Sequence, residues 1–277
     1  MIFVGKFSGV LFYTDYDDTL YNTAHTVSPE NRAAIRYFIQ NGGRFSIATG
    51  RAHRTFTPQI AKEELELNAP VVLSNGAMLY DYQADRCLAE SHLDGDAPER
   101  LAQLCRVFPD LAVEAYHGEE IYVHNPNAVT TAHLTKVGGV QIPCPIGSMP
   151  TPWIKVLLEQ DHPYLLAAQA HLLRCWGDSF EAIFSNPYLL ELTAKGCHKG
   201  SMAARAARLL HIDPRHFYCM GDNQNDLPML ELSALPFAPA NCAPEVRGWL
   251  AARGRAPLGH CDEHAVAQAI GILDSLY

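Results

Sequence analysis

The chain has 277 residues, of which 48% are hydrophobic and 18% charged, a balance typical of a globular protein and not of a disordered one. The formal net charge of -9 disfavours a nucleic-acid partner, because phosphate backbones are held by clustered Lys and Arg. A small phosphorylated ligand remains compatible with this charge, since one metal ion and one lysine can reverse the local field.

No apolar run in the sequence reaches the length of a membrane span, and no secretory cleavage site follows the apolar start. The eight cysteines include no C-x-x-C pair, which disfavours a zinc site or a disulfide framework. Reduced thiols in a cytoplasm are the simpler interpretation, so we expect a cytoplasmic protein without a membrane partner.

The first third of the chain predicts strands that alternate with helices. Residues 10–14 form a nearly continuous apolar run, which is typical of a strand buried on both faces. Ser28 is suited to cap a helix that begins at Pro29 and ends at Gly42. The other elements expected here are a strand at 45–48, a helix at 55–67 and a strand at 71–74.

The alternation resumes near Lys199. We expect a helix at 201–210, a strand at 217–220, a helix at 226–232, a strand at 235–237 and two closing helical stretches. This pattern predicts an α/β fold in which a doubly wound parallel sheet is wrapped by helices.

Roughly 100 residues separate the two halves, which is about the commonest size for a separate domain. We expect a core domain made of residues 1–82 and 188–277, with residues 83–187 inserted as an α+β cap domain. The elements expected in the middle of the chain are a hairpin at 111–115 and 121–124, strands at 153–158, 182–184 and 189–192, helices at 98–108 and 163–175, and a long loop rich in Gly and Pro at 138–152.

Two carboxylates follow the first strand directly. Asp15 and Asp17 are two residues apart, so in an extended segment their side chains point to the same side. Ligands of open α/β sheets bind beyond the carboxyl ends of strands, where this pair lies. Two carboxylates about 4 Å apart repel by about 4 kcal/mol at an effective dielectric near 20, and a divalent cation or a shared proton would relieve that repulsion. An acidic turn that merely ends a strand is the alternative.

Three further groups adjoin elements of the same sheet. Thr49 offers a hydroxyl at a strand end, and Gly50 lets the backbone approach a ligand beside a helix N-terminus. Lys199 opens a helix, at the unfavourable end for the helix dipole. Asp222 and Asp226 lie four apart after the strand at 217–220, and oxygen ligands of this type suit magnesium. Singly, a capping turn, an exposed lysine and an Asn- and Asp-rich helix cap would explain them as well.

Together these residues resemble the four motifs of the haloacid dehalogenase (HAD) superfamily. Its DxDxT, Thr/Ser, Lys and acidic motifs are matched by Asp15-Tyr-Asp-Asp-Thr19, Thr49, Lys199 and Gly221-Asp-x-x-Asn-Asp226. Four segments resemble the Cof-like (IIB) phosphatases of that superfamily: Ala48-Thr-Gly-Arg51, Ser74-Asn-Gly-Ala77, Lys199-Gly200 and Gly221-Asp-Asn-Gln-Asn-Asp-Leu-Pro-Met-Leu230. Such proteins insert an α/β cap of the C2 type between the third strand and the lysine, as expected here.

The resemblance implies a magnesium-dependent phosphatase that acts on a small phosphate monoester, such as a sugar phosphate or a cofactor phosphate. Asp15 would attack phosphorus and form an aspartyl-phosphate, and Asp17 would protonate the leaving alkoxide and then deprotonate water. Thr49 and Lys199 would complete the catalytic set by holding a phosphoryl oxygen and stabilising charge.

Binding groups are implied by the same resemblance. The phosphate would be bound by Thr49, Gly50, Arg51, Asn75 and Asn225. Mg²⁺ would be bound by the Asp15 carboxylate, the Asp17 main-chain carbonyl and Asp222, with Asp226 in support. The only partner implied is a small phosphorylated metabolite, and a cap that opens and closes would admit it and exclude water.

Departures from the family pattern remove no chemical group. Asp18 stands where Gly is common, His198 where a small polar residue is common, and Ala240-Asn-Cys242 matches an Asn-Ala element only loosely. Arg51 could reach a substrate anion or pair with a nearby carboxylate. The segment His260-Cys-Asp-Glu-His264 matches no trusted zinc spacing, so we expect no zinc site there.

Three other functions stay open. A phosphomutase shares the core motifs and a similar cap, but returns the phosphoryl group to a rotated intermediate. A phospho-accepting receiver also uses Asp, Thr and Lys, yet it is much shorter and lacks the acidic pair Asp222 and Asp226. A catalytically silent phosphometabolite-binding protein would keep the fold without the chemistry. Oligomeric state cannot be read from the sequence.

Overall fold

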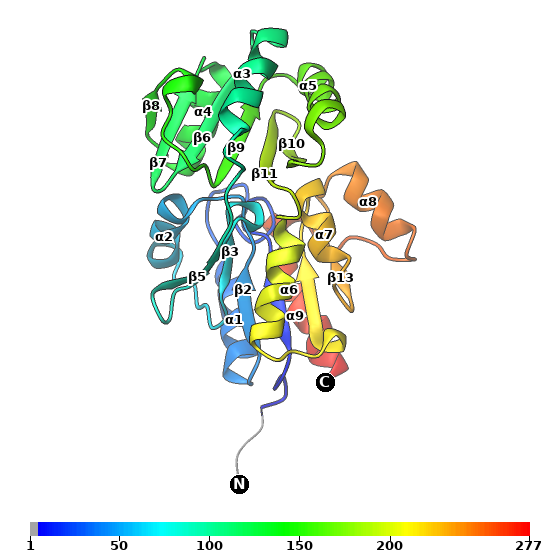
Figure 1. Ribbon diagram of the computed structural model, residues 1–277. Helices are drawn as coiled ribbons and strands as arrows, with labels where there is room; N and C mark the ends of the chain where they lie inside the picture. Colours follow the sequence, from blue (N-terminus) through cyan, green and yellow to red (C-terminus); the bar gives the residue numbers. More distant parts are fainter. Residues whose placement is uncertain (1–4) are drawn as a thin grey trace.

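The apolar runs of the two chain halves build one parallel sheet in the lower part of the molecule (Figure 1). The structure is a computed structural model that describes residues 5–277. The strand order is β13-β12-β1-β2, with all pairs parallel. A parallel bridge between Ala48 and Val72 continues this sheet to β3, which begins an antiparallel β3-β4-β5 extension. These strands are β1 (Leu11–Thr14), β2 (Arg44–Ile47), β3 (Val71–Leu73), β4 (Met78–Asp81), β5 (Arg86–Glu90), β12 (Phe217–Met220) and β13 (Pro236–Phe237).

Helices cover both faces of this sheet. Phe12 of β1 packs in one core cluster with Phe38 of α1 and Val266 of α9, whereas Leu11 and Tyr13 pack in another with residues of the helices on the opposite face. Neighbouring residues of a strand point to opposite faces, so the apolar run needs helices on both sides. The core helices are α1 (Pro29–Gln40), α2 (His53–Lys62), α6 (Lys199–Leu209), α7 (Leu227–Leu230), α8 (Pro244–Ala251) and α9 (Ala265–Leu276). The predicted doubly wound α/β core is therefore confirmed.

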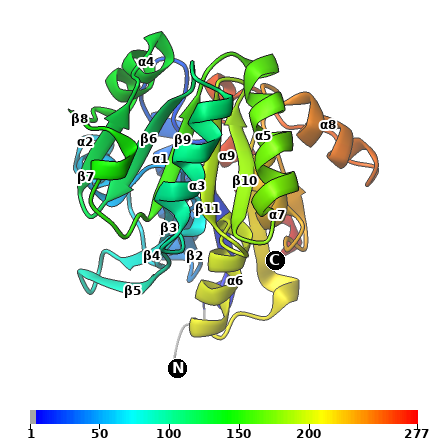
Figure 2. The ribbon, with the colours of Figure 1, turned by 45° about the horizontal axis from the view of Figure 1, so that its top comes forward.

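The inserted segment forms a second sheet above the first, with the order β10-β11-β9-β6-β7-β8. All its pairs are antiparallel except β7 with β8. Helices α3 and α5 lie across its outer face (Figure 2), and α4 contributes Leu134 to the cluster on the other face. The elements are α3 (Ala97–Val107), β6 (Ala112–His117), β7 (Glu120–His124), α4 (Ala128–Val137), β8 (Gln141–Pro143), β9 (Lys155–Glu159), α5 (His162–Trp176), β10 (Phe180–Asn186) and β11 (Leu189–Ala194). This confirms the predicted α+β cap.

Several predicted element ends are wrong. The helix expected at 55–67 spans His53–Lys62 instead, because Glu64 adopts φ +52 and ends it. The loop expected at 138–152 contains β8 and a 3-10 turn at Ile146–Ser148. Strand β8 has an exposed side chain at every position, so it carries no alternation of buried and exposed residues to reveal it. The hairpin of β4 and β5 and the helix α4 were not predicted.

The predicted division of the chain at 82/83 and 187/188 stays a prediction, but strand pairing differs from it at both junctions. Strand β5 pairs with β4 of the core, although it lies inside the range 83–187. Strand β11 pairs with β9 and β10 of the cap, although it lies after residue 187. We propose that the cap begins after residue 92 and ends near residue 194.

Along residues 5–277, every helix is too short or too polar to cross a membrane. The C-terminus lies at the end of the core that points away from the cap (Figure 1). The carboxyl ends of β1, β2, β3 and β12 point toward the cap (Figure 1).

Candidate active site

The predicted site residues meet at the carboxyl ends of the parallel strands. Asp15 follows β1 directly, Thr49 lies two residues beyond β2, and Asp222 lies two residues beyond β12. Backbone bonds fix these ends, because the Asp15 amide donates to Met220 O (2.8 Å) and the Thr49 amide to Val72 O (2.8 Å). Sheet geometry thus gathers residues that lie far apart in the sequence.

Lys199 is the buried centre of the site. Its Nζ donates to Asp15 Oδ1 and to Asp226 Oδ1, both at 2.6 Å, and its side chain is 1% exposed. Burial by itself lowers the pKa of Lys199, but the charges of Asp15 and Asp226 outweigh burial and raise it above its usual value. The lysine therefore stays charged, and its two carboxylate partners offset its unfavourable position at the N-terminus of α6.

Asp222 and Asp226 have different surroundings although both lie in one acidic turn. The backbone amides of Asp222 and Asn223 donate to Asp226 Oδ2 (2.9 and 3.0 Å), so Asp226 stabilises the turn. Its other oxygen, Oδ1, accepts from Lys199. Asp222 receives a hydrogen bond from Thr19 Oγ1 on its Oδ1 (2.9 Å). Side chains of Asp15, Asp222 and Asp226 offer carboxylate oxygens that lie within 4.8 Å of one another.

This donor set fits a hard divalent cation. Among residues 5–277, three carboxylates face one ammonium group, so two of the negative charges have no countercharge there. Burial raises the pKa of Asp15 well above its usual value despite Lys199, and burial with the charge of Asp226 raises the pKa of Asp222 to about 7. A cation bound by carboxylate oxygens would reverse both shifts, which is the chemistry that magnesium ligation supplies.

Arg51 pairs with Asp17 in the structure. Its Nε and Nη2 donate to the two carboxylate oxygens of Asp17 (2.8 and 2.7 Å), and its guanidinium stacks 5.1 Å from the ring centroid of Tyr16. Burial raises the pKa of Asp17, but the hydrogen bonds and charge of Arg51 outweigh it and hold the pKa below its usual value. Of the two roles considered for Arg51, pairing with a carboxylate is the one seen. Its buried Nη1 makes no hydrogen bond to any residue between 5 and 277.

Two loops brace each other beside this pair. The amides of Asn75 and Ser74 donate to the carbonyl oxygens of Thr49 (3.0 Å) and Arg51 (2.9 Å). Ser74, Asn75 and Gly76 all have positive φ, so the chain turns sharply there. Asn225 Nδ2 donates to Asn75 Oδ1 (3.0 Å) and ties the turn to the acidic loop. Of the predicted residues, the structure thus joins Asn75 and Asn225 to the site.

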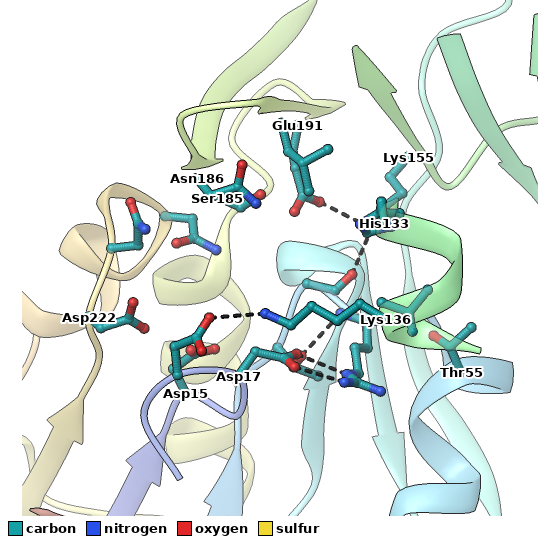
Figure 3. Close-up of a pocket in the computed structure, with 18 of the residues that line it drawn as sticks. Asp15, Asp17, Thr55, His133, Lys136, Lys155, Ser185, Asn186, Glu191 and Asp222 are labelled. Atoms are coloured by element: carbon teal, nitrogen blue, oxygen red, sulfur yellow. Dashed lines mark hydrogen bonds and ion pairs between the residues drawn. The ribbon is translucent and has the colours of Figure 1, made fainter. Parts of the chain in front are cut away.

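The cap supplies the opposite wall of a cavity of about 120 Å³. Figure 3 shows Asp15, Asp17 and Asp222 on the core side, with Ser185, Asn186 and Glu191 facing them from the cap. The cap also contributes Tyr116, His133, Lys136, Val137, Lys155 and Leu189. Lys136 Nζ reaches across to Asp18 Oδ2 (3.0 Å), and His53 Nδ1 lies 3.0 Å from Glu119 Oε1, so both domains are in contact around the cavity.

Sequence reasoning missed these cap residues, although two signals could have found some of them. Lys155 begins β9, which is apolar up to Glu159 at its other end, and Glu191 is the one charged residue of β11; charges in such apolar strands are seldom fully buried without a specific partner. Helix α4, which carries His133 and Lys136, begins after the N-cap residue Asn127 and ends at Gly138, whose φ is +71. Five of its ten residues are β-branched, which disfavours a helix, so the sequence did not predict α4.

The departures from the family pattern have structural explanations. His198 caps α6, since its Nδ1 accepts from the Ser201 amide (3.1 Å), and burial lowers its pKa, which keeps that nitrogen an acceptor. Asp18 adopts φ +60, a backbone conformation that Asp tolerates better than most residues. His260, Cys261 and Asp262 do lie within 4.8 Å of one another. However, His260 Nδ1 accepts from the Asp262 amide (3.2 Å) and the Asp262 carboxylate accepts from Thr23, so a helix-cap role explains this cluster.

The chain is similar to known proteins along most of its length. Residues 12–270 match the model of a family described as haloacid dehalogenase-like hydrolase. Among curated relatives, the chain is 26% identical over 258 residues to the HMP-PP phosphatase of Serratia proteamaculans, with 91% of each chain covered. It is 24% identical over 259 residues to the 5-amino-6-(5-phospho-D-ribitylamino)uracil phosphatase of Bacillus subtilis, with 84% of this chain and 88% of that protein covered.

Solved structures share the whole fold. A HAD subclass IIB sugar phosphatase superposes with a TM-score of 0.83 at 18% identity, covering 96% of this chain and 99% of its own. A haloacid dehalogenase-like hydrolase from Bacteroides thetaiotaomicron superposes with a TM-score of 0.80 at 22% identity, covering 95% of this chain and 99% of its own. Core and cap therefore occur together in these proteins in the arrangement described above.

Proposed function

Because this chain belongs to the haloacid dehalogenase-like hydrolases, we propose that it is a phosphatase of their Cof-like (IIB) group and that it hydrolyses a small phosphate monoester through an aspartyl-phosphate on Asp15. The observation that carries the proposal is the contact between Asp15 Oδ1 and the buried Lys199 at 2.6 Å, beside Asp222 and at the end of β1. This lysine holds one carboxylate oxygen of Asp15 and leaves Oδ2 to form the bond to phosphorus.

Asp17 completes the proposed proton transfers. The Asp15 oxygen attacks phosphorus while the bond to the ester oxygen breaks, and Asp17 gives its proton to that leaving oxygen. A water molecule then loses a proton to Asp17 as it attacks the phosphorus of the aspartyl-phosphate, which frees Asp15 and inorganic phosphate. Since Arg51 holds Asp17 as a carboxylate here, we propose that bound phosphate draws Arg51 away and allows Asp17 to carry a proton.

A magnesium ion is proposed at the acidic cluster. Its ligands would be the Asp15 carboxylate, the Asp17 main-chain carbonyl and Asp222, with Asp226 in support through the turn and Lys199. Bound there, the ion would supply charge neutralisation for the phosphoryl group and hold it in line with Asp15. Phosphate would be held by Thr49, Gly50, Arg51, Asn75 and Asn225, and the buried polar atoms Arg51 Nη1 and Asn75 Nδ2, which have no partner within residues 5–277, support this set.

The cavity favours a small, hydroxylated leaving group. Its volume of about 120 Å³ compares with roughly 10–15 Å³ for one water on the same measure, so it admits a small metabolite and excludes a folded protein. The cap wall offers Ser185, Asn186 and Glu191, which can exchange hydrogen bonds with hydroxyls. These three polar side chains favour a sugar phosphate over a cofactor phosphate with an aromatic ring, although Tyr116 and Leu189 also line the cap side and HMP-PP is the named substrate of one relative. A cytoplasmic location remains a prediction.

A panel of phosphorylated sugars, nucleotides and cofactors tests the proposal. We expect phosphate release with Mg²⁺, none with EDTA, and none from Asp15→Asn in either condition. Isomerised sugar phosphate without phosphate release would instead show a phosphomutase. Binding of an ester without any turnover would show a phosphometabolite-binding protein, and the hydrolase proposal would fail.

A further inference from the structure

The loop Thr49–Arg51 is held by three successive carbonyl oxygens. Thr49 O accepts from the Asn75 amide (3.0 Å) and Arg51 O from the Ser74 amide (2.9 Å), both within the core. Gly50 O accepts instead from Lys155 Nζ at 2.7 Å, and Lys155 lies on β9 of the cap. The middle of the loop is thus fixed only when cap and core are in contact.

Lys155 depends on this contact for its own hydrogen bonds. Its side chain is 2% exposed, and its other polar contacts are Glu191 Oε2 at 3.1 Å and the Tyr116 ring, whose centroid lies 4.5 Å away. A buried ammonium is costly unless its donors are satisfied. Since Gly50 O is the main-chain acceptor on the core side, separating the domains would break this hydrogen bond and leave water to replace it.

Glu191 gives a reason for the glycine at position 50. A Cβ added to Gly50 would lie 2.9 Å from Glu191 Oε1, closer than real side chains approach. The backbone of Gly50 has no positive φ, so its conformation alone does not require glycine. From the sequence we expected Gly50 to allow close approach of a ligand, whereas the structure shows a cap carboxylate at this place.

We propose that Lys155 and Glu191 are positioning residues that set the Thr49–Arg51 loop for phosphate binding when the cap closes. They act through Gly50 on the two residues beside it, the hydroxyl of Thr49 and the guanidinium of Arg51. This inference rests on the proposed function only for the identity of the phosphate site. It adds that the cap, besides facing the leaving group, completes the part of the core that holds the phosphoryl group.

Lys155→Met tests the proposal, because it keeps an unbranched apolar stem of four atoms and removes the ammonium. The matched control is Lys195→Met, which removes a cap ion pair to Glu181 (3.3 Å) at a lysine whose side chain is 51% exposed. Inorganic phosphate is the probe, since it occupies the phosphate site without a leaving group. We expect Lys155→Met to weaken phosphate binding, measured by calorimetry with Mg²⁺, by about tenfold or more, as for a lost hydrogen bond to a charged group. The value of kcat/KM should fall by a similar factor. Lys195→Met should match the wild-type protein, and Lys155→Arg should recover part of the loss.

A second pair of variants keeps the proposal testable if Lys155→Met fails to fold. Gly50→Ala should weaken phosphate binding, and it should do so by a smaller factor when it is added to Glu191→Ala than when it is added to the wild-type protein, because Glu191→Ala removes the oxygen that meets the new Cβ. Unchanged phosphate affinity in Lys155→Met, with only a raised KM or a lowered melting temperature, would overturn the inference. A wild-type protein that binds phosphate but hydrolyses no ester would overturn the proposed function alone.

Discussion

Thr19 shows how one hydroxyl can tune the proposed metal site. Its Oγ1 donates to Asp222 Oδ1 at 2.9 Å and orients that carboxylate. Thr19→Val keeps the shape and removes the donor, so we expect Mg²⁺ affinity to fall by about tenfold, as is usual when a hydrogen-bond partner of a metal ligand is lost. Mg²⁺ titration of activity measures this, with Thr19→Ser as the control that keeps the hydroxyl. Equal Mg²⁺ dependence in Thr19→Val and the wild-type protein would place the metal away from Asp222.

Gly76 is a position where only glycine fits. Its φ is +97, and an added Cβ would lie 2.2 Å from His198 O, next to Lys199. We expect Gly76→Ala to lower the free energy of unfolding by about 2 kcal/mol or more, from backbone strain and overpacking together. Urea unfolding checks this against Gly95→Ala, where an added Cβ meets no atom within 4 Å. If both variants lost the same stability, the close approach to His198 would not matter.

Residues of the core site could be predicted because their neighbourhood is encoded locally. Asp15, Thr49 and Asp222 each follow an apolar strand, and parallel strands end at one edge whatever lies above them. The pairing of Arg51 with Asp17 could not be predicted, because the sequence does not distinguish between several carboxylates that Arg51 could pair with. Lys155 and Glu191 were missed for a further reason, since their meaning depends on which cap strand lies over Gly50.

Helix α4 is the element that brings His133 and Lys136 to the cavity. Asn127 caps it by accepting from the amides of Val129 (2.8 Å) and Thr130 (3.1 Å). We expect Asn127→Ala to cost about 1 kcal/mol of stability and to raise KM, because the helix frays at the end that anchors it to the cap sheet. Unfolding curves and steady-state kinetics measure the two effects.

The matched control for that variant is Asp161→Ala, which removes the N-cap side chain of α5. This helix lies on the outer face of the sheet of the cap domain. It should lose similar stability and keep the wild-type KM. A raised KM in both variants would indicate a general loosening of the cap. The helices α3 and α5 could be predicted from their apolar stripes, whereas α4 could not, because its Val and Thr residues are typical of strands.

Stability of the whole molecule should depend on a buried carboxyl group of the cap. Burial and the neighbouring Glu114 raise the pKa of Glu159 to about 8, whereas the value in an unfolded chain is 4.5. Between these two pH values the folded protein keeps a proton that the unfolded chain releases. The free energy of unfolding therefore falls as pH rises through this window, by at most about 1.4 kcal/mol per pH unit. Glu159→Gln should flatten this fall in urea unfolding between pH 5 and 8, and parallel curves for the two proteins would contradict the assignment.

At the largest scale, core and cap share the work that we propose. The core supplies Asp15, Lys199 and the acidic cluster, and the cap reaches it through Lys136, Lys155 and Glu119. We expect the cap to move away to admit substrate and to return over the cavity, which excludes water from the aspartyl-phosphate. Identical X-ray scattering profiles with and without phosphate and Mg²⁺, together with unchanged cap orientation in structures of both states, would contradict this motion.

The most direct measurement is to trap the intermediate on Asp15. Borohydride reduces an aspartyl-phosphate to homoserine. With an aryl phosphate such as p-nitrophenyl phosphate, whose leaving group needs no proton from Asp17, Asp17→Asn should make the intermediate accumulate, because the water of the second step would lack its base. We expect homoserine at position 15, detected by peptide mass spectrometry, after Asp17→Asn is incubated with that ester and Mg²⁺, and none in Asp15→Asn. Continued phosphate release by the wild-type protein, with residue 15 found only as aspartate in both proteins, would show that Asp15 is not the nucleophile.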